Sequence, residues 1–156
     1  MFGLQVRYLS FFFGIISIFS FFNIVYSYYF NLYLNLDTYF YTLIFSFLIF
    51  IVLYIFGKNI KRPSIFDKIL IIFLGYLVLP LILSIPFYLS IYNLTFLNSY
   101  FESISGFTST GFTIFENIRL IDQSLIIWRS STQWIGGLYF LFSIIYLIDI
   151  YDESFK

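Results

Sequence analysis

Cysteine and histidine are both absent from this chain of 156 residues. Their absence excludes disulfides, thiolate nucleophiles, imidazole metal ligands and histidine general bases. Charge is also scarce, because only 10% of the residues are charged, whereas soluble domains average about 25%. The formal net charge is zero, and no basic block with interleaved aromatics indicates a nucleic-acid partner. With 61% hydrophobic residues, the chain is predicted to lie in a lipid membrane.

Long apolar runs are what the sequence has in place of charge. A transmembrane helix needs about 20 apolar residues to cross about 30 Å of hydrocarbon. Runs of that length extend over Tyr8 to Phe30, Thr38 to Phe56, Ile69 to Leu89 and Leu125 to Ile148. The first is longer than the apolar part of a signal peptide and is followed by no small-residue cleavage site, so we interpret it as a retained span. The predicted fold class is all-α integral membrane.

The placement of basic residues predicts the orientation of these spans. Basic residues precede the first span and separate the second from the third, at Arg7, Lys58, Lys61, Arg62 and Lys68. The loop from Asn31 to Asp37 has none. The positive-inside rule therefore predicts a cytoplasmic N-terminus. By parity, residues 91–124 lie outside and a tail at 151–156 is cytoplasmic.

The outer segment contains a run that is apolar but too short to cross the membrane, from Leu94 to Phe107. We interpret it as a re-entrant helix with Thr95 near its N-cap, whose C-terminal carbonyls point toward the bilayer centre and favour a cation. Gly106 is expected to close this helix through a positive φ.

The loop after this helix is small and polar and comprises Thr108, Ser109, Thr110, Gly111 and Phe112. Irregular backbone at membrane depth is tolerated where it is buried in protein or lines a water-filled cavity. Backbone carbonyls and hydroxyls of such a loop can replace the hydration shell of an ion, and glycine leaves the carbonyls unobstructed. The alternative is a tight extracellular turn without a ligand.

The fourth span carries small and polar residues at helical spacing, namely Arg129, Thr132, Gln133, Gly136 and Gly137. They form one face of a helix. One interpretation directs this face toward the re-entrant helix, with Arg129 anchoring the loop and pairing with Glu102, or else with Glu116 or Asp122. The other is small-residue helix packing with a snorkelling arginine. The first is favoured because Trp128 and Trp134 are expected to supply the interfacial anchors.

Two dense motifs now support a family resemblance. The run FESISGFTSTGFTIFENI followed by SLIIWRSSTQWIGGL resembles the first pore repeat of the Trk/Ktr/HKT potassium transporters, and it is similar to the bacterial TrkH type. The resemblance extends from Ile65 to about Leu138, and the two earlier spans match the N-terminal hairpin of the TrkH branch in number and position. It implies a helix–pore helix–filter loop–helix repeat. Thr108 to Phe112 would form one segment of the selectivity filter, potassium would be held by Thr108, Ser109, Thr110 and Gly111, and Glu102, Arg129, Gln133 and Gly136 would support it.

The resemblance also implies a domain organisation and partners. Residues 1–64 would form the N-terminal hairpin and cytoplasmic loop, 65–150 the pore repeat, and 151–156 the tail. Family members carry four repeats in one chain, and only one is found here. We therefore expect a fragment or split subunit that needs the remaining repeats on another chain, or, less favoured, copies of itself as a homotetramer.

The expected function is potassium uptake, passive or ion-coupled as in a symport, across the plasma (inner) membrane. Membrane lipid surrounds the chain, potassium is the transported substrate, and no cofactor is expected. In the family a cytosolic nucleotide-binding regulatory subunit docks on the inner face. A non-conducting structural or regulatory subunit is the alternative. An enzyme is not expected, because Glu102, Glu116 and Asp122 lack a nucleophile or metal set beside them.

Overall fold

A computed structural model describes residues 6–57 and 64–154 of the chain. Over these residues it is entirely helical and contains no strand, which confirms the all-α fold class. The basic residues Lys58, Lys61 and Arg62 lie outside the described residues. The α-helices are α1 Val6–Tyr29, α2 Leu36–Phe56, α3 Ile65–Leu83, α4 Ile85–Tyr88, α5 Phe96–Phe107 and α6 Gln123–Ser154, and a single 3-10 turn, η1, covers Ile118–Leu120.

Four of the helical segments are long and apolar enough to cross a membrane, namely Arg7–Tyr29, Leu36–Phe56, Ile65–Tyr88 and Gln123–Ile148. The chain is therefore a multi-pass membrane protein, as predicted. The third segment begins four residues before the predicted Ile69, because Ser64 and Asp67 form a reciprocal capping box. It is interrupted at Ser84, after Pro80, and continues as the short α4. Helix α6 continues to Ser154 and is 32 residues long.

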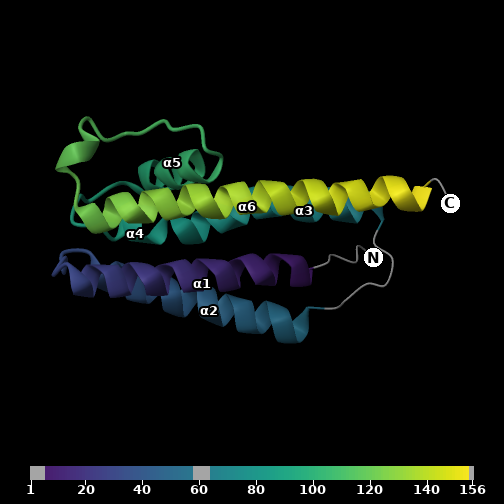
Figure 1. Ribbon diagram of the computed structural model, residues 1–156, viewed down its shortest axis with the longest axis horizontal. Coiled ribbons are helices and arrows are strands. Elements are labelled where there is room, and N and C mark those ends of the chain that lie inside the picture. Colours follow the sequence, from purple (N-terminus) through teal and green to yellow (C-terminus); the bar gives the residue numbers. More distant parts are fainter. Residues whose placement is uncertain (1–5, 58–63, 155–156) are drawn as a thin grey trace.

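Helices α1 and α2 form an antiparallel pair that packs on one side of α3 and α6, and α5 lies on the other side of α6 (Figure 1). Asn31, at a φ of 57°, makes the turn between the paired helices. At the end of the bundle where α1 and α3 begin, the Arg7 guanidinium lies over the Tyr54 ring and the Lys68 ammonium over the Tyr146 ring.

Buried aromatic side chains fill the space between α1, α3 and α6. Tyr139 and Phe12 pack edge to face, with ring centroids 4.7 Å apart, and the Tyr139 hydroxyl donates to the carbonyl of Ile72 at 2.8 Å. Trp128 is fully buried, and its Nε1 donates to the carbonyl of Leu83 at 3.0 Å. The expectation that Trp128 anchors the membrane interface is therefore wrong. Trp134 is 69% exposed, but it lies near the middle of the apolar segment Gln123–Ile148 and not near either end of it.

Candidate functional site

The short helix α5 is held between two spanning helices. Its first turn is capped by Thr95, whose hydroxyl accepts a hydrogen bond from the Asn98 amide, as predicted. Its 12 residues are about 18 Å long, which is too short to cross the hydrocarbon. Ser103 ties it to α3 by donating to the carbonyl of Pro80 at 2.6 Å.

The C-terminal end of α5 lies halfway along α6. A Cβ at Gly136 would overlap the carbonyl oxygen of Phe107, the last residue of α5. Gly136 is midway along the apolar segment Gln123–Ile148. The carbonyl end of α5 is therefore at mid-span depth, where a helix C-terminus presents partial negative charge.

Gly106 does not close α5, and that expectation is corrected by the structure. It lies inside the helix and is buried, and a Cβ there would overlap the hydroxyl of Thr132 on α6. Glycine at 106 thus permits the close approach of two helices. The positive φ angles occur later in the loop, at Ser109 (55°) and Gly111 (81°). The left-handed conformation at Gly111 is the kind that favours glycine.

The loop residues singled out by the sequence are exposed, from Thr108 through Phe112. The carbonyls of Thr108, Ser109 and Thr110 accept no hydrogen bond from the part of the chain that the structure describes. The carbonyl of Phe112, by contrast, accepts one from Ser105 at 2.6 Å and one from Arg129 at 2.9 Å. The loop thus has unengaged carbonyls at its start and a fixed carbonyl at its end.

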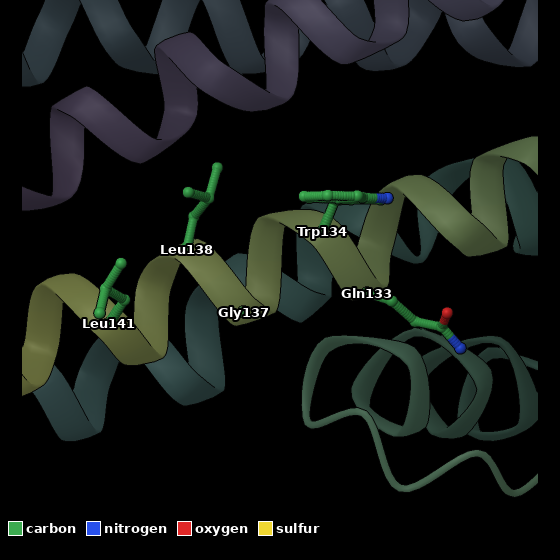
Figure 2. A pocket seen from close by; sticks show the side chains of 5 residues that line it. All are labelled: Gln133, Trp134, Gly137, Leu138 and Leu141. Carbon is green, nitrogen blue, oxygen red and sulfur yellow. The ribbon is translucent and has the colours of Figure 1, made fainter.

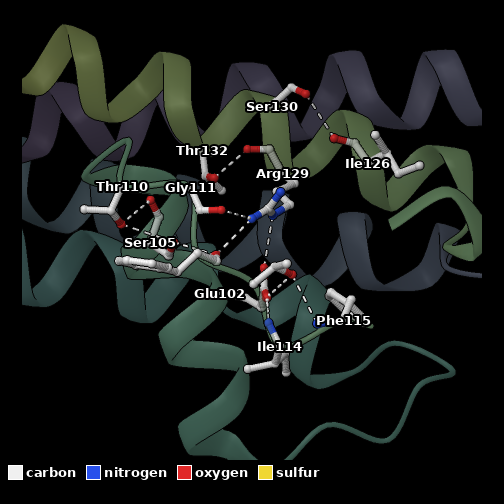
Figure 3. A network of polar contacts seen from close by, with 12 residues as sticks. Glu102, Ser105, Thr110, Gly111, Ile114, Phe115, Ile126, Arg129, Ser130 and Thr132 are labelled. Atoms are coloured by element: carbon white, nitrogen blue, oxygen red, sulfur yellow. Dashed lines mark hydrogen bonds and ion pairs between the residues drawn. The ribbon is translucent and has the colours of Figure 1, made fainter. Parts of the chain in front are cut away.

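A buried ion pair holds the end of this loop. Arg129 Nε donates to Oε2 of Glu102 at 3.0 Å, and Glu102 is fully buried. The other carboxylate oxygen of Glu102 accepts hydrogen bonds from the Thr113 hydroxyl and the Ile114 amide, both at 2.6 Å. Figure 3 shows Arg129 between this carboxylate and the loop carbonyls. We call these two residues and their bonds to the loop the Glu102–Arg129 clamp.

The other acidic residues considered as partners of Arg129 lie elsewhere. Glu116 is exposed. Asp122 accepts hydrogen bonds from Asn35 at 2.9 Å and from the Ser124 hydroxyl. The partner of Arg129 is therefore Glu102, the first of the three alternatives.

The small-residue face of α6 divides into two parts. Thr132 and Gly136 are buried against α5. Gln133 and Gly137 instead contribute to a pocket of about 450 Å³ that is also lined by Trp134, Leu138 and Leu141 (Figure 2). Gln133 forms no hydrogen bond with the described loop residues. Its support of the filter loop therefore stays a prediction.

A second pocket lies directly at the end of α5. It has a volume of about 470 Å³ and is lined by Tyr76, Phe107, Thr108, Ser109, Gly136, Gly137 and Phe140. The start of the loop and the middle of α6 therefore border the same cavity. Irregular backbone at membrane depth is expected to line such a space.

A polar network at the end of the bundle where α2 and α6 begin was not predicted from the sequence. It joins Asn35 to Asp122, Tyr39 to Ser124 and Tyr92 to Asp122. The only sequence signal was the presence of polar residues within or beside apolar spans, and it did not indicate which of them pair.

Part of the chain is similar in sequence to known cation transporters. The chain is 41% identical over 64 residues to an uncharacterized cation transporter of Methanocaldococcus jannaschii, a match that covers 41% of this chain and 14% of the relative. It is 33% and 34% identical over 73 residues to the Trk system potassium uptake proteins TrkG and TrkH of Escherichia coli K12, over 46% of this chain and 15% of each relative. No family model and no solved structure matches.

The matches confirm the resemblance to the Trk-type superfamily over part of the chain. The relatives are named as transport proteins, in agreement with the prediction that this chain is not an enzyme. The chain aligns with only about a seventh of the length of these relatives.

Proposed function

We propose that this chain forms one wall of a potassium-selective uptake pore, with the loop from Thr108 to Gly111 as its segment of the selectivity filter. The observation that carries the proposal is the contrast within the loop. The carbonyls of Thr108, Ser109 and Thr110 are unengaged, whereas the following residues are held by the Glu102–Arg129 clamp. Preorganised carbonyls can replace a cation's hydration shell without reorganising when the ion arrives.

Electrostatics and shape support the same role. The carbonyl end of α5 lies at mid-span beside the second pocket, and its partial negative charge stabilises a cation there. Phe112 directly follows this segment and supports it, because its carbonyl is bound by Ser105 and Arg129.

A single loop covers one side of an ion, so the complete filter requires further repeats, on another chain or on copies of this one. We further propose the plasma (inner) membrane as the location, with the N-terminus cytoplasmic. Arg7 and Lys68 lie in the first turns of α1 and α3, and we assign that end of the bundle to the cytoplasm by the positive-inside rule. A cytosolic nucleotide-binding subunit is the regulatory partner that the resemblance suggests.

The first prediction tests the filter through Gly111. A chimera would carry residues 1–148 of this chain in place of the corresponding hairpin and first repeat of a TrkH-type transporter. Gly111→Ser is expected to reduce the preference for potassium over sodium by about tenfold or more, because a side chain at a φ of 81° strains the loop. The measurement is uptake of each ion in cells that lack other potassium transporters. Asn117→Ser, in the exposed outer loop, is the matched control.

Two results would contradict the proposal. An active chimera whose ion preference is unchanged by Gly111→Ser and by bulkier residues at that position would identify the loop as a plain turn. A chimera that inserts and assembles but transports neither ion would favour a non-conducting structural subunit.

A further inference from the structure

The outer end of the bundle contains a residue that joins three separate segments. Asn35 precedes α2 and is 1% exposed. Its Nδ2 donates to the Asp122 carboxylate at 2.9 Å, and its Oδ1 accepts from the Ile91 amide at 3.2 Å. One side chain thus links the turn of the N-terminal hairpin, the connection between α4 and α5, and the start of α6.

The contacts continue from Asp122 to the proposed filter. The Asp122 amide donates to the Tyr92 hydroxyl at 2.7 Å, and the Tyr92 ring packs on the ring of Phe115 at 5.8 Å. The Phe115 amide donates to the Thr113 hydroxyl at 3.1 Å, which in turn donates to Glu102. The path therefore ends in the Glu102–Arg129 clamp.

A second pair of residues reinforces the start of this path. The buried Tyr39 hydroxyl and the Ser124 hydroxyl are 2.9 Å apart, and Ser124 also donates to the Asp122 carboxylate. Asp122 is thus held in two ways. Asn35 in the hairpin turn donates to it directly, and Tyr39 of α2 is linked to it through Ser124. Hydrogen bonds to a charged acceptor in a low-dielectric setting are the strong ones.

We propose that Asn35 is a positioning residue for the filter loop, so that the N-terminal hairpin sets the geometry of the loop through the Asn35–Asp122 contact. The effect on ion selectivity rests on the function proposed above, whereas the effect on loop geometry does not. The path consists of hydrogen bonds and one ring contact, and Asn35 also reaches Tyr92 through its chain neighbour Ile91.

Exchanging the two partners provides the test. Asn35→Asp opposes two carboxylates and removes the donor, so it breaks the contact, whereas Asp122→Asn removes the charge and leaves a weaker bond between two neutral amides. The double exchange restores an amide–carboxylate pair and leaves the total charge as it was. Asn117→Asp adds the same charge in the exposed outer loop and keeps a side-chain oxygen for the Arg119 amide, so it is the matched control.

The first measurement is amide hydrogen exchange of the full chain in lipid nanodiscs. Asn35→Asp is expected to speed exchange about tenfold at Ile91, at Asp122 and also at Ile114, which donates to Glu102. The double exchange should return all three amides to within about twofold of the original chain, and Asn117→Asp should change none. If Asn35→Asp yields no folded protein, Tyr92→Phe cuts the path one contact later and carries the same expectation at Ile114.

Faster exchange confined to Ile91 and Asp122, with Ile114 unchanged, would overturn the inference. The second measurement is ion preference in the chimera, where Asn35→Asp should weaken potassium selectivity and the double exchange should restore it. A chimera that responds to Gly111→Ser but not to Asn35→Asp overturns this inference alone. A chimera that responds to neither overturns the proposed function, while the exchange data still decide whether the hairpin positions the loop.

Discussion

At the scale of single residues, the pairing of Arg129 decides between two interpretations of that side chain. A snorkelling arginine would extend to the headgroups, but the Arg129 side chain is only 12% exposed and donates to Glu102 and to the carbonyl of Phe112. Glu102 has both carboxylate oxygens hydrogen-bonded. A buried charge with all its groups satisfied is costly to alter, since removing one partner leaves the other uncompensated.

Replacement of Glu102 tests the clamp. Glu102→Gln should lower the stability of the purified chain by about 3 kcal/mol, because it leaves Arg129 with a neutral partner in a buried site. The measurement is the midpoint of thermal unfolding in detergent. Glu116→Gln removes the same charge from an exposed position and should leave the midpoint unchanged. Equal effects of the two substitutions would show that total charge, and not the clamp, determines stability.

At the scale of helices, two adjacent glycines of α6 have different surroundings. A Cβ at Gly136 would overlap the carbonyl oxygen of Phe107, whereas a Cβ at Gly137 meets nothing within 4 Å. On the α6 side, the close approach of α5 thus requires glycine at 136 and not at 137.

This pair gives a matched prediction. Gly136→Ala should destabilise the chain by about 1–3 kcal/mol, because the helices must separate to admit a methyl group. Gly137→Ala should stabilise it by about 0.5–1 kcal/mol, because alanine is the better helix former and has room. Thermal unfolding in detergent measures both. Similar shifts in the same direction would indicate that helix propensity, and not packing against α5, governs this segment.

Much of the helical arrangement could be predicted because it depends on local sequence. Apolar run length predicted the four spans, and the Thr95 cap predicted the start of α5. The roles of Gly106 and Trp128 were mispredicted because both are set by a neighbouring helix, through Thr132 for one and Leu83 for the other. Motif spacing predicted the loop, and the structure selected Glu102 among three acidic candidates.

The polar network around Asn35 and Asp122 shows why other contacts could not be predicted from the sequence. Asn35 and Asp122 are 87 positions apart and lie in unrelated sequence contexts. Neither periodicity nor a motif links them. Such a pairing follows only once the hairpin has packed against the later helices.

At the scale of the whole molecule, the distribution of polar contacts is uneven along the bundle. The half where α2 and α6 begin has the Asn35–Asp122 network and the Glu102–Arg129 clamp. Arg7 and Lys68, at the opposite end, contact aromatic rings. Between them the helices expose many large apolar side chains, for example Phe47, Leu48 and Phe73, as expected of surfaces that face lipid.

The last prediction tests the proposed membrane orientation with single cysteines, which the cysteine-free chain permits. Asn117→Cys lies in the exposed segment between α5 and α6, and it should react with an impermeant thiol reagent added outside intact cells. Asn59→Cys lies in the basic segment, outside the described residues, and the positive-inside rule predicts that it reacts only from the cytoplasmic side. Inverted membrane vesicles expose that side and should exchange the two results. Because α5 is too short to cross the hydrocarbon, residues on either side of it must share one side of the membrane, so Asn93→Cys should behave as Asn117→Cys does. Labelling of Asn93→Cys and Asn117→Cys from opposite sides would mean that the segment between them crosses the membrane, and the loop could not then be the re-entrant wall of a pore.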